Sequence, residues 1–443
     1  MQHIVIIGNG IAGITAARHI RKLSDYRITV ISGETDHFFS RTALMYIYMG
    51  HMKYEHTKPY EDWFWEKNRI ELKRAWVSTI DYEQKKLTFP EGEDLEYDKL
   101  ILATGSQSNK FGWPGQDLKG VQGLYSYQDL ELMEENTKQV TRAVIIGGGL
   151  IGVEMAEMLH SRHIEVTYLI REDHFWGNVL PEEEATLIDN HLIKHGIDLR
   201  QNTELEEIID DGGGRVKAIK TKAGEIIDCQ FVGLTVGVHP NIDLVKDSKI
   251  EADRGILVDE NLQTNIPDVF AIGDCAQLRI PPQGRRPIEA VWYVGRMMGE
   301  TLARTITGDT TKYQPGIWFN SAKFFDIEYQ NYGVVLPICP DGRDSFYWQC
   351  HDGEKCLKII YQKDNLEVKG VNLFGIRNRH EVWDKWLKEK RPLDYVIQHL
   401  PEANFDPEFF THWEGEIQEK FNQQFPDKAV GVRKKGFLEK LFA

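Results

Sequence analysis

The sequence predicts an α/β protein made of two three-layer domains and a C-terminal α+β domain. The pattern Gly-x-Gly-x-x-Gly occurs twice, and each copy stands between an apolar, β-branched run and a stretch of helix-forming residues. From Tyr313 onward, alternating strand-like segments replace this strand and helix alternation, which predicts the last domain. At 443 residues the chain is long enough for two or three hydrophobic cores.

The first glycine pattern stands where a strand should end and a helix should begin. Gly8, Gly10 and Gly13 follow the apolar run His3 to Ile7 and precede the helix-forming segment Ile14 to Arg21. The first glycine permits a tight turn, the second lets a pyrophosphate approach the backbone, and the third lets helix and strand pack closely. The phosphates would lie at the helix N-terminus, where free N–H groups favour anions. The pattern therefore predicts a Rossmann-like domain that binds a dinucleotide.

The second glycine pattern repeats this setting. Gly147, Gly149 and Gly152 follow the apolar run Ala143 to Ile146 and precede the helix-forming segment Val153 to His160. One such pattern alone is often only a glycine-rich turn, but two copies in the same context argue against that interpretation. We therefore predict that the chain binds two dinucleotides.

A carboxylate about 20 residues after each pattern would hold an adenosine ribose. In the first domain the predicted strand Arg27 to Ser32 is followed by Glu34, which has this charge and position. In the second, the strand Glu165 to Ile170 is followed by Arg171 and Glu172. Arg171 would suit the 2′-phosphate of NADPH, whereas Glu172 would oppose it. The choice between NADH and NADPH therefore stays open, and acceptance of both is expected.

Composition narrows the possible partners. The net charge of −15 argues against nucleic acid or an anionic membrane as the main partner. No run of 18 apolar residues occurs, which predicts no transmembrane helix. Met1 lies directly before the first strand, so no signal peptide and a cytoplasmic location are expected. The 5 cysteines show no zinc-type or C-x-x-C spacing, so we expect reduced thiols and no metal site.

The segments between the two patterns are less regular. An aromatic stretch runs from His37 to Trp65, and strand-like segments are expected at Ala75 to Tyr82 and Lys86 to Phe89. Tyr97 to Ser106 contains an apolar strand that ends in a turn of small residues. Phe111 to Gly115 is expected to be a linker.

The C-terminal half contributes one more apolar strand and the third domain. Asn265 to Asp274 ends in a glycine and a carboxylate, and a helix is expected from Val291 to Thr305. Further on, Cys356 to Tyr361 is expected to pair with Leu366 to Phe374. The amphipathic helix that follows carries Val382, Trp383, Trp386 and Leu387.

The aromatic residues beyond Pro401 are expected to pack on the body of the protein or on a second subunit. The basic tail Arg433 to Phe442 is too short to anchor the chain to a membrane alone, and we expect a frayed terminus. These aromatic residues are Phe405, Phe409, Phe410, Trp413, Phe421 and Phe425.

Four segments resemble, in order, the two-dinucleotide flavoproteins of the pyridine nucleotide-disulfide oxidoreductase superfamily. They are Gly8 to Gly13, Leu102 to Gly105, Gly147 to Gly152 and Phe270 to Asp274. The resemblance implies an FAD-binding domain at residues 1–115 and 241–312 and an NAD(P)-binding domain at 116–240. It also implies that the C-terminal α+β domain, residues 313–443 with an extra helical tail, forms the interface of a homodimer.

The resemblance also implies roles for residues near the FAD. Asp274 would accept hydrogen bonds from the ribityl hydroxyls, unless it is only a helix cap. Val291 and Trp292 would bring a helix N-terminus to the flavin pyrimidine ring, where it stabilises negative charge on the reduced flavin. Arg41 would lie near the pyrophosphate or the ring, unless it is a solvated surface arginine. The other residues assigned to cofactor binding are Thr42, Val77, Ala103, Thr104, Gly105 and Gly237.

Residues near the flavin distinguish the branches of this superfamily. Its disulfide reductases need a redox cysteine on the helix after Glu34, but the first cysteine here is Cys229. The segment Phe38 to Leu44 instead resembles that of rubredoxin reductases, ferredoxin reductases and the flavoprotein portion of nitrite reductases. Rubredoxin-reductase-like members pair a lysine with a glutamate beside the flavin; here the two positions hold Tyr46 and Glu154. We assign both residues as catalytic, although Glu154 could simply occupy the favourable first turn of its helix.

The resemblance therefore implies an FAD-dependent NAD(P)H oxidoreductase. Electrons would pass from the nicotinamide through the flavin to a redox partner such as a small iron-sulfur protein. The alternatives are an NADH:quinone reductase, an NAD(P)H oxidase, and a redox-sensing flavoprotein that binds partners and resembles apoptosis-inducing factor.

Overall fold

The computed structural model describes residues 1–405 and 412–432, and the chain divides into two compact units. Unit 1 comprises Met1–Leu169 and Thr203–Pro315, and unit 2 comprises Ile170–Asn202 and Gly316–Ala443. The finer division of the chain into three domains stays a prediction. The α/β class is confirmed, because parallel sheets with helices form unit 1.

The first parallel sheet of unit 1 has the strand order β19-β7-β1-β2-β3. Its central strand β1 (His3–Ile7) is apolar, and Ile4, Val5 and Ile6 are fully buried. The strand order reverses between β1 and β7, and ligands of open α/β sheets bind at such a reversal. The other strands are β2 (Arg27–Ser32), β3 (Ile70–Arg74), β7 (Lys99–Leu102) and β19 (Val269–Ala271).

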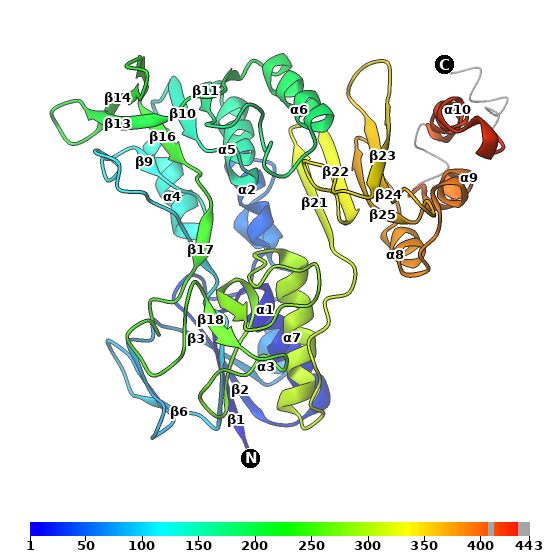
Figure 1. Ribbon diagram of the computed structural model, residues 1–443. Coiled ribbons are helices and arrows are strands. Elements are labelled where there is room, and N and C mark those ends of the chain that lie inside the picture. The colour runs from blue at the N-terminus through cyan, green and yellow to red at the C-terminus, as the bar shows by residue number, and fades with distance from the viewer. Residues whose placement is uncertain (406–411, 433–443) are drawn as a thin grey trace. The chain divides into compact units, whose positions relative to one another are not determined.

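Two helices pack closely beside this sheet. They are α1 (Ile11–Leu23) and α7 (Trp292–Ile306), which lie side by side (Figure 1). A Cβ added at Gly299 of α7 would lie only 2.6 Å from the carbonyl oxygen of Ala12 on α1. The small residue therefore allows the two helices to approach each other.

The second parallel sheet of unit 1 includes strands in the order β11-β10-β16-β9. The strand order again reverses beside β10 (Arg142–Ile146), which pairs with β11 on one side and β16 on the other. The strand and helix predicted around the second glycine pattern are thus confirmed. The other elements here are β9 (Val121–Gln122), β11 (Glu165–Leu169), β16 (Phe231–Leu234), α4 (Tyr127–Asn136) and α5 (Leu150–Ser161).

Smaller elements complete unit 1. The strand expected around Ala75 to Tyr82 is present only as the short β4 (Thr79–Asp81), and β3, which joins the first sheet, was not predicted. The sequence of β3 is IELKR, and its side chains are half exposed at the sheet edge, so it lacks the apolar signal of a buried strand. The remaining strands are β5 (Lys86–Thr88), β6 (Leu95–Glu96), β8 (Ser106–Ser108), β13 (Leu205–Asp210), β14 (Val216–Thr221), β15 (Ile226–Asp228), β17 (Val238–Pro240), β18 (Ile256–Val258) and β20 (Ala276–Leu278). The short helices are α2 (Leu44–Tyr48) and α3 (Trp63–Lys67), with turns of 3-10 helix at Arg41–Ala43, Tyr54–Thr57 and Gly273–Cys275.

Unit 2 is built on an antiparallel sheet with the order β21-β22-β25-β24-β23. The predicted hairpin and the amphipathic helix after it are confirmed as β24 (Cys356–Gln362), β25 (Val368–Phe374) and α8 (His380–Lys388). The other strands are β21 (Phe319–Phe324), β22 (Ile327–Gly333), β23 (Arg343–Gln349) and the short β12 (Asp198–Arg200). The other helices are α6 (Glu182–Lys194), α9 (Leu393–Ala403) and α10 (Glu414–Gln424), with a turn of 3-10 helix at Pro426–Lys428.

The core of unit 2 lies between its sheet and the C-terminal helices. Trp383 and Trp386 of α8 are buried there, and Phe421 of α10 packs edge-on against Phe346 of β23. The predicted packing of the C-terminal aromatic residues is therefore confirmed for Phe421. Phe409, Phe410 and the basic tail lie outside the described residues.

Glu184, in the first turn of α6, carries a fully buried carboxyl group. Its Oε2 accepts a hydrogen bond of 2.7 Å from Asn372 of β25, whereas its Oε1 has no partner in the described part of the chain. Burial raises the pKa of Glu184 from an ordinary value of 4.5 to about 8. The folded state therefore holds a proton that the unfolded state loses, so unit 2 should lose stability as the pH rises from 4.5 to about 8.

Replacing Glu184 with glutamine is expected to remove this loss, because the amide has the same shape and does not ionise. In the wild type the loss should approach about 1.4 kcal/mol per pH unit. Hydrogen exchange of the β24 and β25 amides in both proteins, from about pH 5 to about pH 8, measures the difference. Glu182→Gln, an exposed neighbour on α6, is the matched control. Equal pH slopes in the wild type and Glu184→Gln would contradict the assignment.

Candidate functional site

A cavity of about 1340 Å³ lies at the strand-order reversal of the first sheet, entirely within unit 1. It is lined by the turn after β1, the segment after β2, the turn after β7 and the start of α7. Residues distant in the sequence thus meet at the carboxyl ends of parallel strands. The predicted site residues that line it are Gly8, Gly10, Glu34, Arg41, Thr42, Val77, Ala103, Thr104, Gly105, Glu154, Asp274 and Trp292.

The three glycines of the first pattern have different surroundings. A Cβ at Gly8, where φ is +116°, would lie 2.0 Å from the carbonyl oxygen of Ala103. A Cβ at Gly13 would lie 2.0 Å from the carbonyl oxygen of Gly8. At Gly10, by contrast, a Cβ would meet nothing within 4 Å, and Gly10 lines the cavity. The outer glycines therefore serve packing, and the middle one leaves space beside the backbone.

This space lies at a helix N-terminus. Gly10 is the N-cap of α1 and makes no side-chain capping bond, so the first turn of α1 presents backbone N–H donors there. Val291, which is the N-cap of α7, likewise makes no side-chain capping bond, and the next residue, Trp292, lines the cavity. Two helix N-termini thus give this part of unit 1 a positive potential that favours an anionic ligand.

Glu34 and Arg41 form a two-pronged ion pair on the cavity wall. Arg41 Nη1 and Nη2 donate to the Glu34 carboxylate at 2.7 and 2.6 Å, and Nη1 also donates to the carbonyl oxygen of Tyr125 at 2.6 Å. Burial alone would lower the pKa of Arg41, but the hydrogen bonds and charge of Glu34 outweigh it and hold that pKa above its ordinary value. The pair therefore contributes polar groups to the wall of a cavity that suits hydroxyl and phosphate groups.

Asp274 also lines the cavity and lies in the turn of 3-10 helix after β19. Its Oδ2 accepts hydrogen bonds from Ser106 Oγ at 3.2 Å and from the Tyr125 hydroxyl at 3.3 Å. Burial raises the pKa of Asp274 above its ordinary value, and Arg41 opposes that rise. Tyr125 joins Asp274 to Arg41, since the Arg41 guanidinium also lies 4.6 Å from the Tyr125 ring centre. No sequence motif marked Tyr125, which is brought to the site only by the fold.

Of the two residues assigned as catalytic, Glu154 lines the cavity and Tyr46 does not. Glu154 of α5 lines the cavity, and it lies beyond the first turn of its helix, in which no acidic residue occurs. The alternative that Glu154 occupies the first turn is therefore wrong. Tyr46 is on α2, where its ring stacks on His51 at 6.2 Å; its neighbours Leu44 and Met45 line the cavity.

The second glycine pattern repeats the geometry of the first. A Cβ at Gly147 would lie 2.6 Å from the carbonyl oxygen of Thr235, and one at Gly152 would lie 2.1 Å from the Tyr168 hydroxyl. A Cβ at Gly149 would again meet nothing within 4 Å, and Gly149 is the N-cap of α5 without a side-chain capping bond.

Two other predicted residues lie outside the cavity wall. Gly237, with φ of +90°, lies in the crossover after β16, where a Cβ would approach the Asn109 amide at 3.3 Å. Arg171 belongs to unit 2, and its Nε donates to Glu172 at 2.8 Å. The residue expected to select the coenzyme is therefore ion-paired with the neighbour expected to oppose it.

The cysteines do not enter this site. All 5 are free thiols, and none of the residues that line the cavity is a cysteine. Cys275, beside Asp274, is fully buried, and its burial raises the pKa of its thiol. The site therefore offers no dithiol, and the reduced state of the cysteines stays a prediction.

Residues 2–299 match the family model described as pyridine nucleotide-disulphide oxidoreductase. The chain belongs to this family. The matched residues include both glycine patterns and all residues that line the cavity. The match confirms the resemblance stated from the sequence.

Relatives of this family member are reductases of several kinds. The nitrite reductase [NAD(P)H] of Bacillus subtilis (strain 168) is 32% identical over 388 residues, which are 84% of this chain and 46% of that protein. The rubredoxin-NAD(+) reductase of Acinetobacter baylyi is 31% identical over 327 residues, which are 70% of this chain and 80% of that protein. The chain thus spans about half of the nitrite reductase and most of the rubredoxin reductase.

Solved structures share the fold. The NAD-dependent persulfide reductase from A. fulgidus superimposes with a TM-score of 0.83 at 24% identity, covering 96% of this chain and 83% of that one. The ferredoxin reductase for the CYP199A2 system from Rhodopseudomonas palustris gives a TM-score of 0.78 at 22% identity, covering 95% of this chain and 99% of that one.

In the part of the chain that the structure describes, no helix is long and apolar enough to cross a bilayer.

Proposed function

We propose that the chain is an FAD-dependent NAD(P)H oxidoreductase that delivers electrons to a separate redox protein. The observation that carries this proposal is the pair of open glycines, Gly10 and Gly149. Each leaves space at an uncapped helix N-terminus, whereas the glycines around it pack against neighbouring atoms. Such a pair suits two dinucleotides held by their pyrophosphates.

In this proposal the cavity at the strand-order reversal of the first sheet holds FAD. The N-terminus of α1 binds its pyrophosphate beside Gly10, Glu34 accepts hydrogen bonds from the adenosine ribose, and Arg41 adds positive charge near the phosphates. Asp274, already an acceptor for two hydroxyl groups, accepts from the ribityl chain. Thr42, Val77, Ala103, Thr104 and Gly105 complete the wall.

FAD, when bound, accepts a hydride from a reduced nicotinamide and releases the electrons to a second acceptor. The protein itself positions the bound groups and stabilises charge that develops on them. The N-terminus of α7, with Val291 and Trp292, favours negative charge on a group bound beside that helix end. Glu154, which lines the same cavity, orients the nicotinamide side of the site, and Tyr46 on α2 takes the sequence position that holds a lysine in rubredoxin-reductase-like members.

The nicotinamide nucleotide is proposed to bind at Gly147, Gly149 and Gly152. Gly237 gives the crossover between the two nucleotide sites its left-handed conformation. Because Glu172 already pairs with Arg171, we propose that neither a 2′-hydroxyl nor a 2′-phosphate is excluded and that both NADH and NADPH are used.

A small redox protein is the proposed acceptor. Relatives named as reductases of ferredoxin and rubredoxin support this choice, including a benzene dioxygenase ferredoxin reductase subunit of Pseudomonas putida that is 28% identical. An NADH oxidase of Methanocaldococcus jannaschii, 29% identical, supports oxidase activity as the second candidate. Steady-state turnover with ferredoxin, rubredoxin, quinone and oxygen as electron acceptors separates these candidates, and slow turnover with all of them would favour a redox sensor.

We further propose a cytoplasmic homodimer joined through the C-terminal domain.

Replacing Gly149 with valine is expected to stop reduction by the nicotinamide while FAD stays bound. The backbone at Gly149 is extended, with φ of −118°, so the variant should fold, and its side chain should occupy the space proposed for the pyrophosphate. We expect the rate of flavin reduction by NADH at a fixed low concentration to fall at least about 100-fold, equivalent to about 2.7 kcal/mol.

Rapid-mixing absorbance under anaerobic conditions measures this rate. Dithionite, which needs no nucleotide site, should reduce wild type and Gly149→Val alike and serves as the control. An unchanged rate with NADH and NADPH would place the nicotinamide elsewhere and would defeat this part of the proposal.

A further inference from the structure

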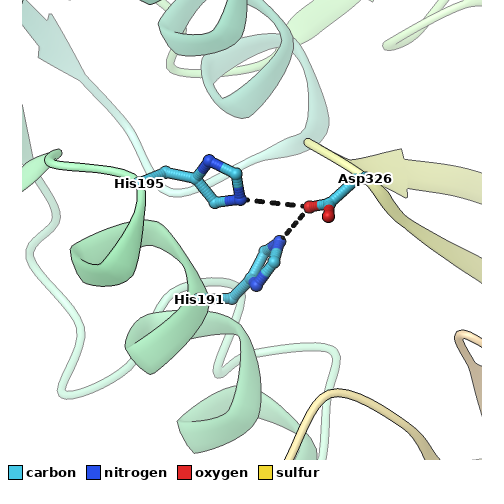
Figure 2. Close-up of side chains that lie close together, drawn as sticks. All are labelled: His191, His195 and Asp326. Carbon is cyan, nitrogen blue, oxygen red and sulfur yellow. Dashed lines mark hydrogen bonds and ion pairs between the residues drawn. The ribbon is translucent and has the colours of Figure 1, made fainter.

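We propose that His191, His195 and Asp326 form a binding site for a divalent transition metal ion, of which Zn²⁺ fits the donors best. The three residues belong to unit 2, and none of them is among the residues assigned above to either nucleotide. Their metal-ligating atoms all lie within 4.8 Å of one another, and Figure 2 shows the three side chains turned toward a common point.

The helix α6 supplies the two imidazoles. His191 is in its last turn and His195 is its C-cap, one turn further on, where the His195 N–H donates to the His191 carbonyl oxygen at 3.1 Å. Residues four apart lie on the same side of a helix, so both rings can reach one ion. The His191 side chain is only 3% exposed and that of His195 is 31% exposed, so the inner ligand is held by the protein.

Asp326 supplies the carboxylate from a tight hairpin turn. Phe324 of β21 pairs with Ile327 of β22, which leaves Phe325 and Asp326 as the two turn residues. Phe325 has φ of 54°, a conformation that is costly for a bulky residue, and its ring stacks on His195 at 4.7 Å. The turn therefore both supports the outer imidazole and directs Asp326 to the two rings.

The three ligand atoms already lie close to the separations that a bound zinc ion requires. Asp326 Oδ1 lies 2.6 Å from His191 Nε2 and 3.1 Å from His195 Nε2. A tetrahedral zinc ion with bonds of about 2.0 to 2.1 Å needs donors roughly 3.3 Å apart. Asp326 is 71% exposed, so it can retreat by less than about 1 Å to admit the ion, and water can complete the coordination.

The ligand set and its charge suit this ion. Two neutral imidazoles and one carboxylate are preferred ligands of zinc and neighbouring first-row metals, whereas Mg²⁺ and Ca²⁺ prefer oxygen donors alone. Glu354, which is paired with Lys194, adds negative charge near His191. Since its ligands come from α6 and from the β21–β22 turn, a bound ion would cross-link two distant segments of unit 2.

The sequence predicted no metal site, because the cysteines lack a zinc-type spacing, whereas this site contains no cysteine. The His-x-x-x-His spacing was visible, but the third ligand follows 131 residues after His195 and is brought near only by folding.

The test is zinc binding by the full-length flavoprotein after treatment with a chelator and dialysis. We expect one equivalent of Zn²⁺ per chain to be retained in dialysis against micromolar zinc, measured by elemental analysis. His195→Gln and Asp326→Asn should each weaken binding at least tenfold. Both residues are partly exposed, so these variants should fold, and an unchanged flavin spectrum would verify this. His351→Gln, an exposed histidine of unit 2 outside the cluster, should bind zinc as the wild type does.

Thermal unfolding gives a second readout that does not depend on activity. Added zinc should raise the melting temperature of the wild type and of His351→Gln, and should do so less for His195→Gln and Asp326→Asn. If the wild type retains no zinc, or if the two ligand variants retain it as well as the wild type, the cluster is only a hydrogen-bonded contact and the proposal fails.

Discussion

Replacing Gly10 with valine is expected to yield a folded protein that has lost its FAD. The backbone at Gly10 has φ of −68° and ψ of −178°, which any residue adopts, and a Cβ there meets no atom within 4 Å. The valine side chain would instead fill the space at the N-terminus of α1 where we place the pyrophosphate. We expect the affinity for FAD to fall at least about 100-fold, equivalent to about 2.7 kcal/mol.

The measurement is flavin content after purification, followed by titration of the apoprotein with FAD. Melting of the wild-type apoprotein and of Gly10→Val should occur at similar temperatures, which separates loss of the ligand from loss of the fold. A variant that is as yellow as the wild type and binds FAD equally well would show that the pyrophosphate is not at Gly10.

Replacing Gly8 with alanine, by contrast, is expected to damage the fold itself. The added Cβ would lie 2.0 Å from the Ala103 carbonyl oxygen, and φ of +116° is unfavourable for any residue with a side chain. Backbone strain and overpacking together should lower the free energy of unfolding by about 3 to 5 kcal/mol.

The matched control is Gly10→Ala, because it adds the same methyl group two residues away where space is open. Soluble yield and chemical unfolding of the two apoproteins should differ clearly, with Gly10→Ala close to the wild type. Equal stability of Gly8→Ala and Gly10→Ala would mean that the contact between the turns after β1 and β7 is looser than described.

The dinucleotide folds were predictable because their constraints are local. A tight turn, an open backbone position and a helix–strand contact fall within six residues, so Gly8 and Gly147 could be interpreted without tertiary information. The edge strand β3 was missed because it is half exposed and carries charged residues. Local pattern thus predicted buried strands better than exposed ones.

The missed site residues depend on contacts between distant parts of the chain. Tyr125 joins Arg41 to Asp274, yet these residues are separated by 84 and 149 positions, and no motif links them. The ion pair between Glu34 and Arg41 was also unexpected, because each residue was assigned to a ligand that would compete with it. His191, His195 and Asp326 show the same limit.

Anaerobic titration of the purified full-length protein with NADH and with NADPH tests the central claim most directly. We expect one FAD per chain, and we expect one equivalent of either nucleotide to bleach its visible absorbance. A protein that contains no flavin and does not bind FAD on reconstitution would contradict the claim. A bound flavin that neither nucleotide reduces would contradict it as well.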